Sequence, residues 1–120
     1  MNHVRYISLG NDHTAAITND DVLYTWGYNG SGQLGNGTAE GSVVPIKIMD
    51  NVKTVYAVYN STFILTNDGE LYACGDNSSG RLGDGTTTNR TKPVKILRGV
   101  KTICLSPESV KLKSSISPKV

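Results

Sequence analysis

Apolar residues in this chain gather in short segments, separated by stretches rich in Gly, Asn, Asp and Thr. No segment combines the apolar spacing of an amphipathic helix with capping signals, so the pattern predicts strands and no helical repeats. Four strands are expected in the first part of the chain, and each recurs 48 residues later. The predicted strands are residues 4–9, 14–18, 23–27 and 45–48, then 52–58, 62–66, 71–75 and 93–96.

The four strands of each set differ in their exposure pattern. Residues 14–18 and 62–66 have apolar residues at both odd and even positions, which face opposite sides of a strand. The same holds for most of 23–27 and 71–75. Strands covered on both faces have this pattern. Residues 45–48 alternate and begin with Pro45, which suits an exposed edge where a missing N–H donor costs little. A four-stranded antiparallel sheet packed between copies of itself is typical of a propeller blade, so we predict an all-β fold of two such blades.

The 48-residue period is free of gaps. Residues 4–55 aligned with residues 52–103 are identical at 21 of 52 positions. A fixed period of this length marks a repeat architecture, in which each unit needs its neighbours to bury its faces. We place repeat 1 at 4–51, repeat 2 at 52–99 and the first strand of a truncated third repeat at 100–106. Residues 107–120 form a basic Ser/Pro/Lys tail that we expect to be irregular.

One motif within the period is long and specific. It contains Gly10-x-x-His13-Thr14, then Trp26-Gly27-x-Asn29, then Gly32-Gln33-Leu34-Gly35. This pattern resembles the regulator of chromosome condensation repeat. The second repeat departs from it, with Val58, Ser61, Cys74 and Arg81 at the positions of the Gly, His, Trp and Gln.

The resemblance implies a seven-bladed β-propeller, of which this chain carries a part. Its members include a nucleotide-exchange factor for a small GTPase, plant photoreceptors, ubiquitin-ligase appendages and bacterial secreted proteins. They share loops presented at the propeller faces and no common chemistry. We expect a fragment of a longer propeller. The alternatives are a subunit that completes a ring by oligomerising and a degenerate remnant.

Two turn and loop positions carry specific expectations. Asn67-Asp68-Gly69 predicts a type I′ hairpin turn, and Asp21 takes the place of the glycine in the first repeat. Leu34 and Leu82 lie in turn-rich sequence at the same register of both repeats. We expect both leucines to be buried equivalently, because a solvated loop has no reason to retain them.

Charge and composition narrow the partners. The net charge is +2, and Lys111, Lys113 and Lys119 of the tail outnumber Glu108, so the repeats are neutral. A nucleic-acid partner is therefore not expected, because a binding stripe needs clustered basic residues. No apolar segment approaches the ~18 residues of a membrane span, so no membrane partner is expected. The compartment stays unknown, with a slight preference for the cytoplasm because a secretory signal is lacking.

Catalytic and cofactor chemistry is poorly supported. Residues 30–35 fit a dinucleotide-binding glycine pattern, but the following segment cannot begin the helix that such a site needs. His13 has Ser61 as its counterpart and is assigned a hydrogen-bonding role, and Cys74 is expected to be a small buried residue. We therefore expect no enzyme activity, no cofactor and no metal.

The residues that follow the third strand differ between the repeats on a fixed turn skeleton. Such variation on a rigid frame diversifies binding surfaces. The sequence therefore predicts a non-catalytic module that presents loops for protein–protein recognition, with possible self-association through exposed blade faces. The alternatives are part of a guanine-nucleotide exchange factor for a small GTPase and a purely structural or degenerate blade pair. The candidate contact residues are Tyr28, Asn29, Gln33, Asp76, Asn77 and Arg81.

Overall fold

The computed structural model describes residues 1, 3–105 and 110–114, and the side chains of this part up to residue 100. All the regular secondary structure in this part is β-strand, and it contains no helix that could cross a membrane. The strands are β1 (Val4–Leu9), β2 (His13–Thr18), β3 (Leu23–Gly27), β4 (Ser42–Met49), β5 (Val52–Val58), β6 (Ser61–Thr66), β7 (Leu71–Gly75), β8 (Arg90–Leu97), β9 (Val100–Leu105) and β10 (Val110–Ser114).

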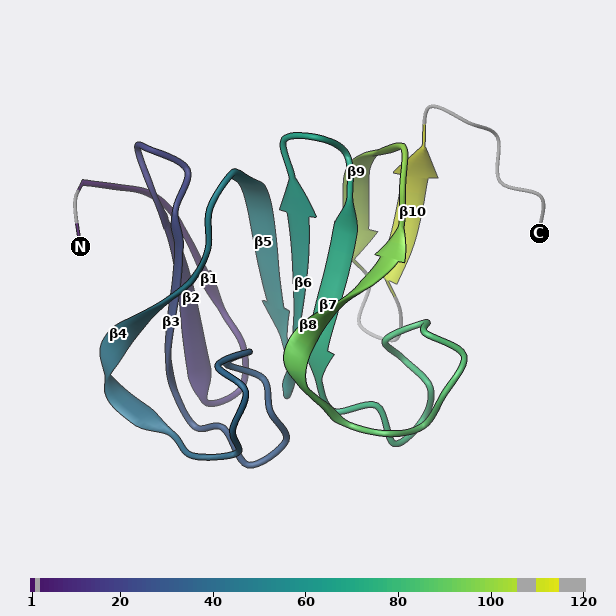
Figure 1. The fold of residues 1–120 in the computed structure, drawn as a ribbon, viewed down its shortest axis with the longest axis horizontal. Coiled ribbons are helices and arrows are strands. Elements are labelled where there is room, and N and C mark those ends of the chain that lie inside the picture. Colours follow the sequence, from purple (N-terminus) through teal and green to yellow (C-terminus); the bar gives the residue numbers. More distant parts are fainter. Residues whose placement is uncertain (2, 106–109, 115–120) are drawn as a thin grey trace.

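The first eight strands form two four-stranded sheets. The order is β1-β2-β3-β4 in the first and β5-β6-β7-β8 in the second, and all neighbouring pairs are antiparallel. Figure 1 shows the two sheets side by side with the same connectivity, as expected of successive blades. The prediction of two four-stranded antiparallel blades is confirmed.

A third, two-stranded sheet follows. β9 pairs with β10 in antiparallel fashion, with Val110 opposite Leu105 and Leu112 opposite Ile103. The expectation of an irregular tail is therefore wrong for residues 110–114; the rest of 107–120 lies outside the described residues. Val110, Leu112 and the intervening Lys111 alternate with the period of a strand. This alternation is short and lies outside the repeat motif, so the 48-residue period does not indicate it.

The edge strands are longer than the sequence indicated. β4 begins at Ser42 and β8 at Arg90, so Pro45 and Pro93 lie inside their strands. The register shifts in both sheets beside these prolines, between the third strand and the fourth. Pro is compatible with this position because its missing N–H faces away from the sheet at an edge.

Four residues connect β2 to β3, and four connect β6 to β7. In the second, Gly69 has a φ of 79° and its N–H donates to Thr66 O at 3.1 Å, but Asp68 is not among the residues with positive φ. The type I′ prediction is therefore wrong, because that turn needs positive φ at both central residues; a turn closed by a left-handed residue fits instead. The expectation that Asp21 replaces the glycine is confirmed by its φ of 64°.

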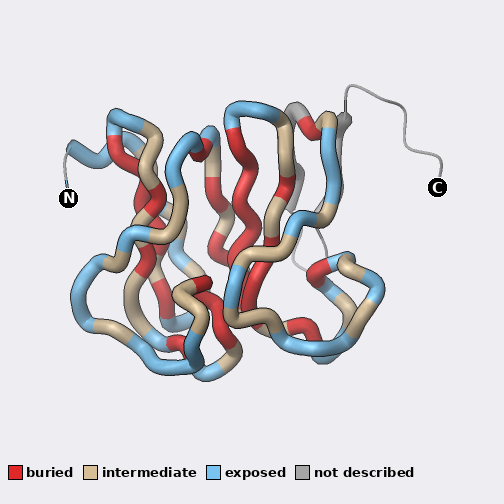
Figure 2. The backbone as a smooth tube through the Cα atoms, in the orientation of Figure 1, coloured by how far each residue is buried: buried red, intermediate tan, exposed pale blue. Residues whose placement is uncertain are grey.

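The core lies in the seams between sheets. Ala15, Ile17 and Leu23 of the first sheet are fully buried against Val52, Val55 and Ile64 of the second. Figure 2 shows the buried positions running along the inner strands, with exposed residues at the turns and on the outer edges. β2 and β6 supply small and branched side chains, which let two sheets approach closely.

The second seam repeats the first. Phe63, Leu65 and Leu71 occupy the positions of Ala15, Ile17 and Leu23, and they pack with Val100 at the start of β9. Leu82 joins this cluster from the loop after β7. Leu34 and Leu82 are 0% and 2% exposed, which confirms their predicted equivalent burial.

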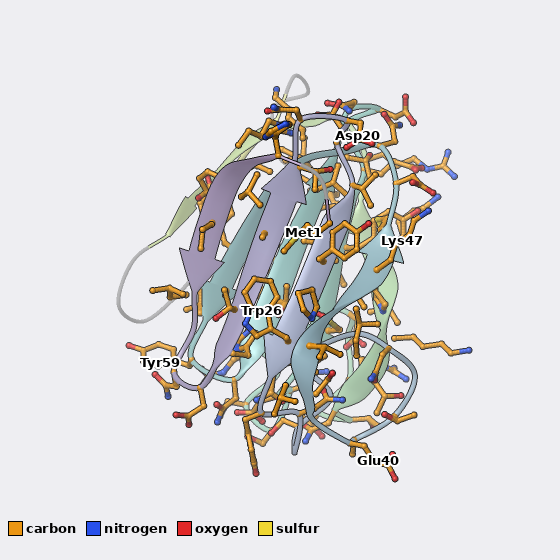
Figure 3. The ribbon with its side chains drawn as sticks, turned by 90° about the vertical axis from the view of Figure 1, so that its left-hand side faces the viewer. Met1, Asp20, Trp26, Glu40, Lys47 and Tyr59 are labelled. Atoms are coloured by element: carbon orange, nitrogen blue, oxygen red, sulfur yellow. The ribbon has the colours of Figure 1, made fainter. Side chains whose placement is uncertain are left out.

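The opposite face of the first sheet carries apolar side chains too. Ile7 and Leu9 of β1 are 56% and 70% exposed. Tyr24 and Trp26 alternate with the buried Leu23 and Thr25 and so point to this face, and Figure 3 shows Trp26 lying on it. The corresponding face of the second sheet is covered by the first.

Replacing Leu34 or Leu82 with Ala should lower the free energy of unfolding by about 2–5 kcal/mol, because each change leaves a cavity in a fully enclosed site. Chemical denaturation followed by circular dichroism measures the change. Val43→Ala is the control, since Val43 is 97% exposed, and it should change stability by less than about 0.5 kcal/mol. Unchanged midpoints for both leucine variants would contradict the prediction.

Candidate interaction loops

The long loops after β3 and β7 lie at one end of the two sheets. Residues 28–41 and 76–89 reach this end together with the turns at 10–12 and 59–60, as Figure 1 shows. Backbone hydrogen bonds join the four segments. Tyr28 N donates to Asp12 O at 2.9 Å, Asn11 N to Tyr59 O at 3.0 Å, and Asp76 N to Asn60 O at 2.9 Å. The end is thus one connected surface.

Two of the predicted contact residues, Asn29 and Asn77, lie inside their loops. They are 1% and 0% exposed. Asn29 Nδ2 donates to Thr38 O and Glu40 O, both at 2.8 Å, and its Oδ1 accepts from Leu34 N at 2.9 Å. Their prediction as partner contacts is therefore wrong. An amide with donors and an acceptor can bond both ends of a loop at once, and both repeats have Asn at this position.

Asn77 does the same in the second loop. Its Nδ2 donates to Thr86 O and Thr88 O, and its Oδ1 accepts from Leu82 N at 3.0 Å. Asp84 Oδ1 also accepts from Asn77 Nδ2 at 3.0 Å, and Asp84 Oδ2 pairs with Arg90 Nε at 2.8 Å. Arg90 and the hydroxyl of Thr86 hold the pKa of Asp84 well below its usual range.

Gln33 is buried between the sheets and is not a surface residue. It is 0% exposed, and its backbone carbonyl oxygen accepts from Thr62 Oγ1 at 2.6 Å and from Cys74 Sγ at 3.6 Å. The neighbouring Gly32, with φ of 87°, packs so closely on β8 that a Cβ there would lie 2.6 Å from Arg90 O. The prediction of Gln33 as a partner contact is also wrong, because Gln33 is buried and this loop of the first sheet is bonded to the second sheet.

The other three predicted residues stay accessible. Tyr28 is 55% exposed, Arg81 is exposed and Asp76 is half-buried. The N–H of Ser78 bonds to Asp76 Oδ1 at 3.0 Å and lowers the pKa of that carboxyl, with a smaller contribution from Arg81. A negative charge is therefore fixed at the start of the second loop.

Tyr59 belongs to the same surface and was not predicted from the sequence. It is 43% exposed, has a φ of 52°, and carries the guanidinium of Arg81 over its ring at 5.7 Å. A signal existed, since the equivalent of Tyr59 is Asn11, so an aromatic residue stands in a tight turn where the first repeat has Asn. We call Tyr28, Tyr59, Asp76 and Arg81 the loop-end surface. Figure 3 places Tyr59 at this end, opposite Asp20.

His13 and Cys74 each form a hydrogen bond across the seam between the two sheets, and both side chains are buried from solvent. The Thr62 hydroxyl donates to Gln33 O, so it accepts from His13 Nε2 at 2.9 Å, which places the proton of a neutral His13 on Nε2. Burial lowers the pKa of His13 to about 4, against the smaller opposing effects of a hydrogen bond to the Ser61 backbone and of the Asp12 charge. Burial raises the pKa of the Cys74 thiol to about 12. The hydrogen-bonding role of His13 and the burial of Cys74 are confirmed; the side chain of Cys104 lies outside the described residues.

Within the described residues no group of three or more His, Cys, Asp or Glu side chains is placed to hold a metal ion. Residues 30–35, which fit a dinucleotide pattern, lead into further turns rather than into a helix. This segment is bonded to the second sheet, with Gly37 N donating to Thr91 O at 2.8 Å.

These blades and their buried loop anchors define a propeller-repeat protein. Two models of the regulator of chromosome condensation (RCC1) repeat match the chain, one over residues 4–33 and 52–81 and the other over 20–65 and 68–110. The chain belongs to this repeat family.

Curated relatives share about one repeat with the chain. The human E3 ubiquitin-protein ligase HERC2 is 41% identical over 46 residues, which cover 38% of this chain and 1% of HERC2. The ultraviolet-B receptor UVR8 of Arabidopsis thaliana is 42% identical over 45 residues, which cover 38% of this chain and 10% of UVR8.

Solved structures match over most of the chain. Human WBSCR16 superposes with a TM-score of 0.75 at 23% identity, covering 87% of this chain and 28% of that protein. Prp20p from Saccharomyces cerevisiae gives 0.71 at 28% identity, covering 84% and 28%. That structure was described with the binding of Prp20p to Gsp1p and histones, and another shows Kap60 bound to yeast RCC1 (Prp20). The chain spans less than a third of these proteins.

The stability of the chain should fall as the pH drops from 7 to 5. The folded-state pKa of His13, about 4, lies below the ordinary value of 6.5, so the unfolded state binds more protons in this range. The expected loss in the free energy of unfolding is about 2 kcal/mol. Urea denaturation midpoints at several pH values measure it.

His13→Gln is the control for this slope. Its midpoint can be lower at every pH, but it should change little between pH 7 and 5, because the amide does not titrate. The lowered carboxyl pKa values of Asp76 and Asp84 act only at more acidic pH. An equal pH slope in both proteins would contradict the assignment.

Proposed function

We propose that this chain is a non-catalytic module that binds a protein partner through the loop-end surface. The observation that carries the proposal is the exposure of Tyr28 and of Tyr59, the latter with Arg81 over its ring, at an end of the sheets where the loop anchors are buried. Tyr and Arg, together with Trp, are enriched among the residues that contribute most of the binding energy in protein interfaces. Tyr28, Tyr59 and Arg81 each differ from the residue at the equivalent position of the other repeat, so the repeat motif does not dictate them.

The rigid support of the loops favours binding. Asn29 and Asn77 fix both ends of their loops, and Gln33 joins the first loop to the second sheet. A surface that is already ordered loses less conformational entropy on association. The loop-end surface also carries both signs of charge, from Asp76 and Arg81, so a partner with polar and aromatic groups fits it better than a uniformly charged polymer.

The relatives support a protein as the partner. Prp20p was described with binding to Gsp1p and histones, and Kap60 binds yeast RCC1 (Prp20). This chain resembles that protein over less than a third of its length. Because the chain resembles Prp20p, which was described with binding to Gsp1p, part of an exchange factor for a small GTPase is the second candidate function.

Non-catalytic action is consistent with the chemistry of the described residues. His13 is neutral and bonded to Thr62, and the Cys74 thiol is buried with a raised pKa, so neither is a candidate nucleophile or general base. Self-association is a separate proposal, and it concerns Ile7, Leu9 and Trp26 on the opposite face of the first sheet.

A photo-crosslinking phenylalanine analogue placed at Tyr28 or Tyr59 should give covalent adducts with a partner protein, because both rings are exposed at the loop ends. The same analogue at Val43, which is 97% exposed on the edge strand, is the control and should give no specific adduct. Mass spectrometry of the adducts identifies the partner and the contact.

The partner so identified should then bind Tyr28→Ala or Tyr59→Ala with a Kd at least about tenfold higher than that of the unmodified chain. Calorimetric titration measures the Kd, and circular dichroism checks that the variants are folded. Adducts of equal yield from position 43, or unchanged Kd values for both variants, would refute the proposal.

A further inference from the structure

A groove of about 400 Å³ lies between the edge strands of the two sheets. β4 and β8 are the last strands of their sheets, and Figure 1 shows both at the edge away from the seam. The groove is lined by residues 46–49 of β4, by Lys92 and Pro93 of β8, and by Gly35 and Asn36 of the loop after β3. Its volume falls within the range of about 300–1,000 Å³ that ligand pockets occupy. The loop-end surface does not include any of these residues.

Contacts between the two repeats hold the walls of the groove in place. Gly37 N donates to Thr91 O at 2.8 Å, which fixes the loop of the first repeat along β8. A Cβ at Gly35 would lie 3.3 Å from Pro93 Cδ, and one at Gly37 would lie 3.0 Å from Lys92 Cε. The loop backbone therefore packs directly on these two side chains of β8. A site that is already formed loses less conformational entropy when a ligand binds.

The lining of the groove is largely apolar. Ile46, Ile48 and Met49 are half-buried although they lie on an edge strand. Ile48 and Met49 also pack against the core of the first seam, so their positions are fixed. Pro93 adds an apolar ring from the second sheet. An apolar group that enters between the strands would remove the remaining surface of these side chains from water, which favours binding.

Both charged residues of the lining are basic. They are Lys47 and Lys92, and the lining contains no acidic residue. Lys47 Nζ pairs with Asp50 Oδ1 at 3.2 Å, but the two side chains are 55% and 69% exposed, so this pair is weak and can exchange its partner. Lys92 makes no ion pair within the part of the chain that the structure describes.

The second repeat neutralises the lysine at the equivalent position, and the first repeat does so less completely. Lys95 is the equivalent of Lys47, and its Nζ lies 2.7 Å from Glu70 Oε2. The residue equivalent to Glu70 is Val22, so no carboxylate reaches Lys47 from this position. The two edge strands contain four basic residues and no acidic one. The edge of the molecule is therefore positive around the groove, although the repeats as a whole are neutral.

We propose that this groove binds an extended acidic segment of a protein partner. One apolar side chain of the segment enters between β4 and β8, and its carboxylates lie beside Lys92 and Lys47. Charge complementarity selects an acidic ligand. The lining selects a peptide over a nucleic acid, because it has no aromatic residue on which a base could stack. The tail of a second copy does not fit, since residues 107–120 are basic.

A series of peptides tests the chemistry of the ligand on the full, unmodified chain. Titration with acetyl-Asp-Glu-Leu-Glu-Asp-amide should shift the backbone amide signals of residues 46–49 and of Lys92 and Val94. The serine analogue acetyl-Asp-Glu-Ser-Glu-Asp-amide and the uncharged analogue acetyl-Asn-Gln-Leu-Gln-Asn-amide should each bind with a Kd at least about fivefold higher. The first analogue lacks the apolar side chain and the second lacks the carboxylates.

Variants of the chain test the site. Lys92→Gln should raise the Kd of the acidic peptide about threefold to fivefold, the size expected for one exposed ion pair. Arg98→Gln is the matched control, because it removes one positive charge outside the groove from a side chain that is 78% exposed, and it should leave the Kd unchanged. Tyr28→Ala should also leave the Kd unchanged, so this site and the loop-end surface can fail independently. Circular dichroism checks that the variants are folded.

Four outcomes would overturn the proposal. They are equal Kd values for the acidic peptide and either analogue, amide shifts centred on Tyr28 and Arg81 instead of the groove, and a Kd for Lys92→Gln equal to that of Arg98→Gln. The fourth is tighter binding of a single-stranded oligothymidylate of the same charge, with shifts at the same residues, which would assign the groove to a nucleic acid.

Discussion

The packing of one sheet against the next is the interaction on which the structure depends. β2 and β6 carry apolar side chains on both faces. A sheet that buried only one face would leave the apolar side chains of the other face in water. Ala15 and Ile17 against Val55 and Ile64 exclude water from one seam, and Phe63 and Leu65 do so in the next. Burial of such side chains stabilises by roughly 1.5–3 kcal/mol each. Each sheet therefore gains much of its stability from contact with a neighbour.

Polar bonds then fix how the sheets are aligned. The apolar contacts are non-directional, but the hydroxyl of Thr62 and the thiol of Cys74 both meet the carbonyl of Gln33 across the seam. His13 bonds to the same hydroxyl. Hydrogen bonds of this kind, fully buried, are costly to break and so specify one register between sheets. The His-Thr and Gln-Leu-Gly parts of the motif are therefore joined in space although they lie far apart in sequence.

The sequence predicted the architecture well because period and apolar pattern are properties of the whole repeat. The two sheets, the buried leucines and the role of His13 all follow from it. The sequence was a poor guide to which loop residues face solvent. Asn29, Gln33 and Asn77 are polar and lie among turn residues, and a pattern of polarity cannot distinguish a solvated amide from one that bonds its own loop. Tyr59 was missed because a bulky aromatic residue seldom adopts positive φ, so the usual turn motifs do not place one in so tight a turn.

Differences between equivalent positions are the most useful guide to sites in a repeat protein. Where both repeats keep a residue, as at Asn29 and Asn77, the residue satisfies buried backbone groups and has no freedom to change. Where the repeats differ, other contacts stabilise the fold, and the change alters the surface. The buried Gln33 gives way to the exposed Arg81, whose guanidinium lies over the ring of Tyr59. Asp21 gives way to Gly69, so the second sheet cannot repeat the ion pair that Asp21 forms with Arg5. Both changes lie at the ends of the strands, where the backbone hydrogen bonds of the sheet are complete and a side chain can be exchanged without loss of the core.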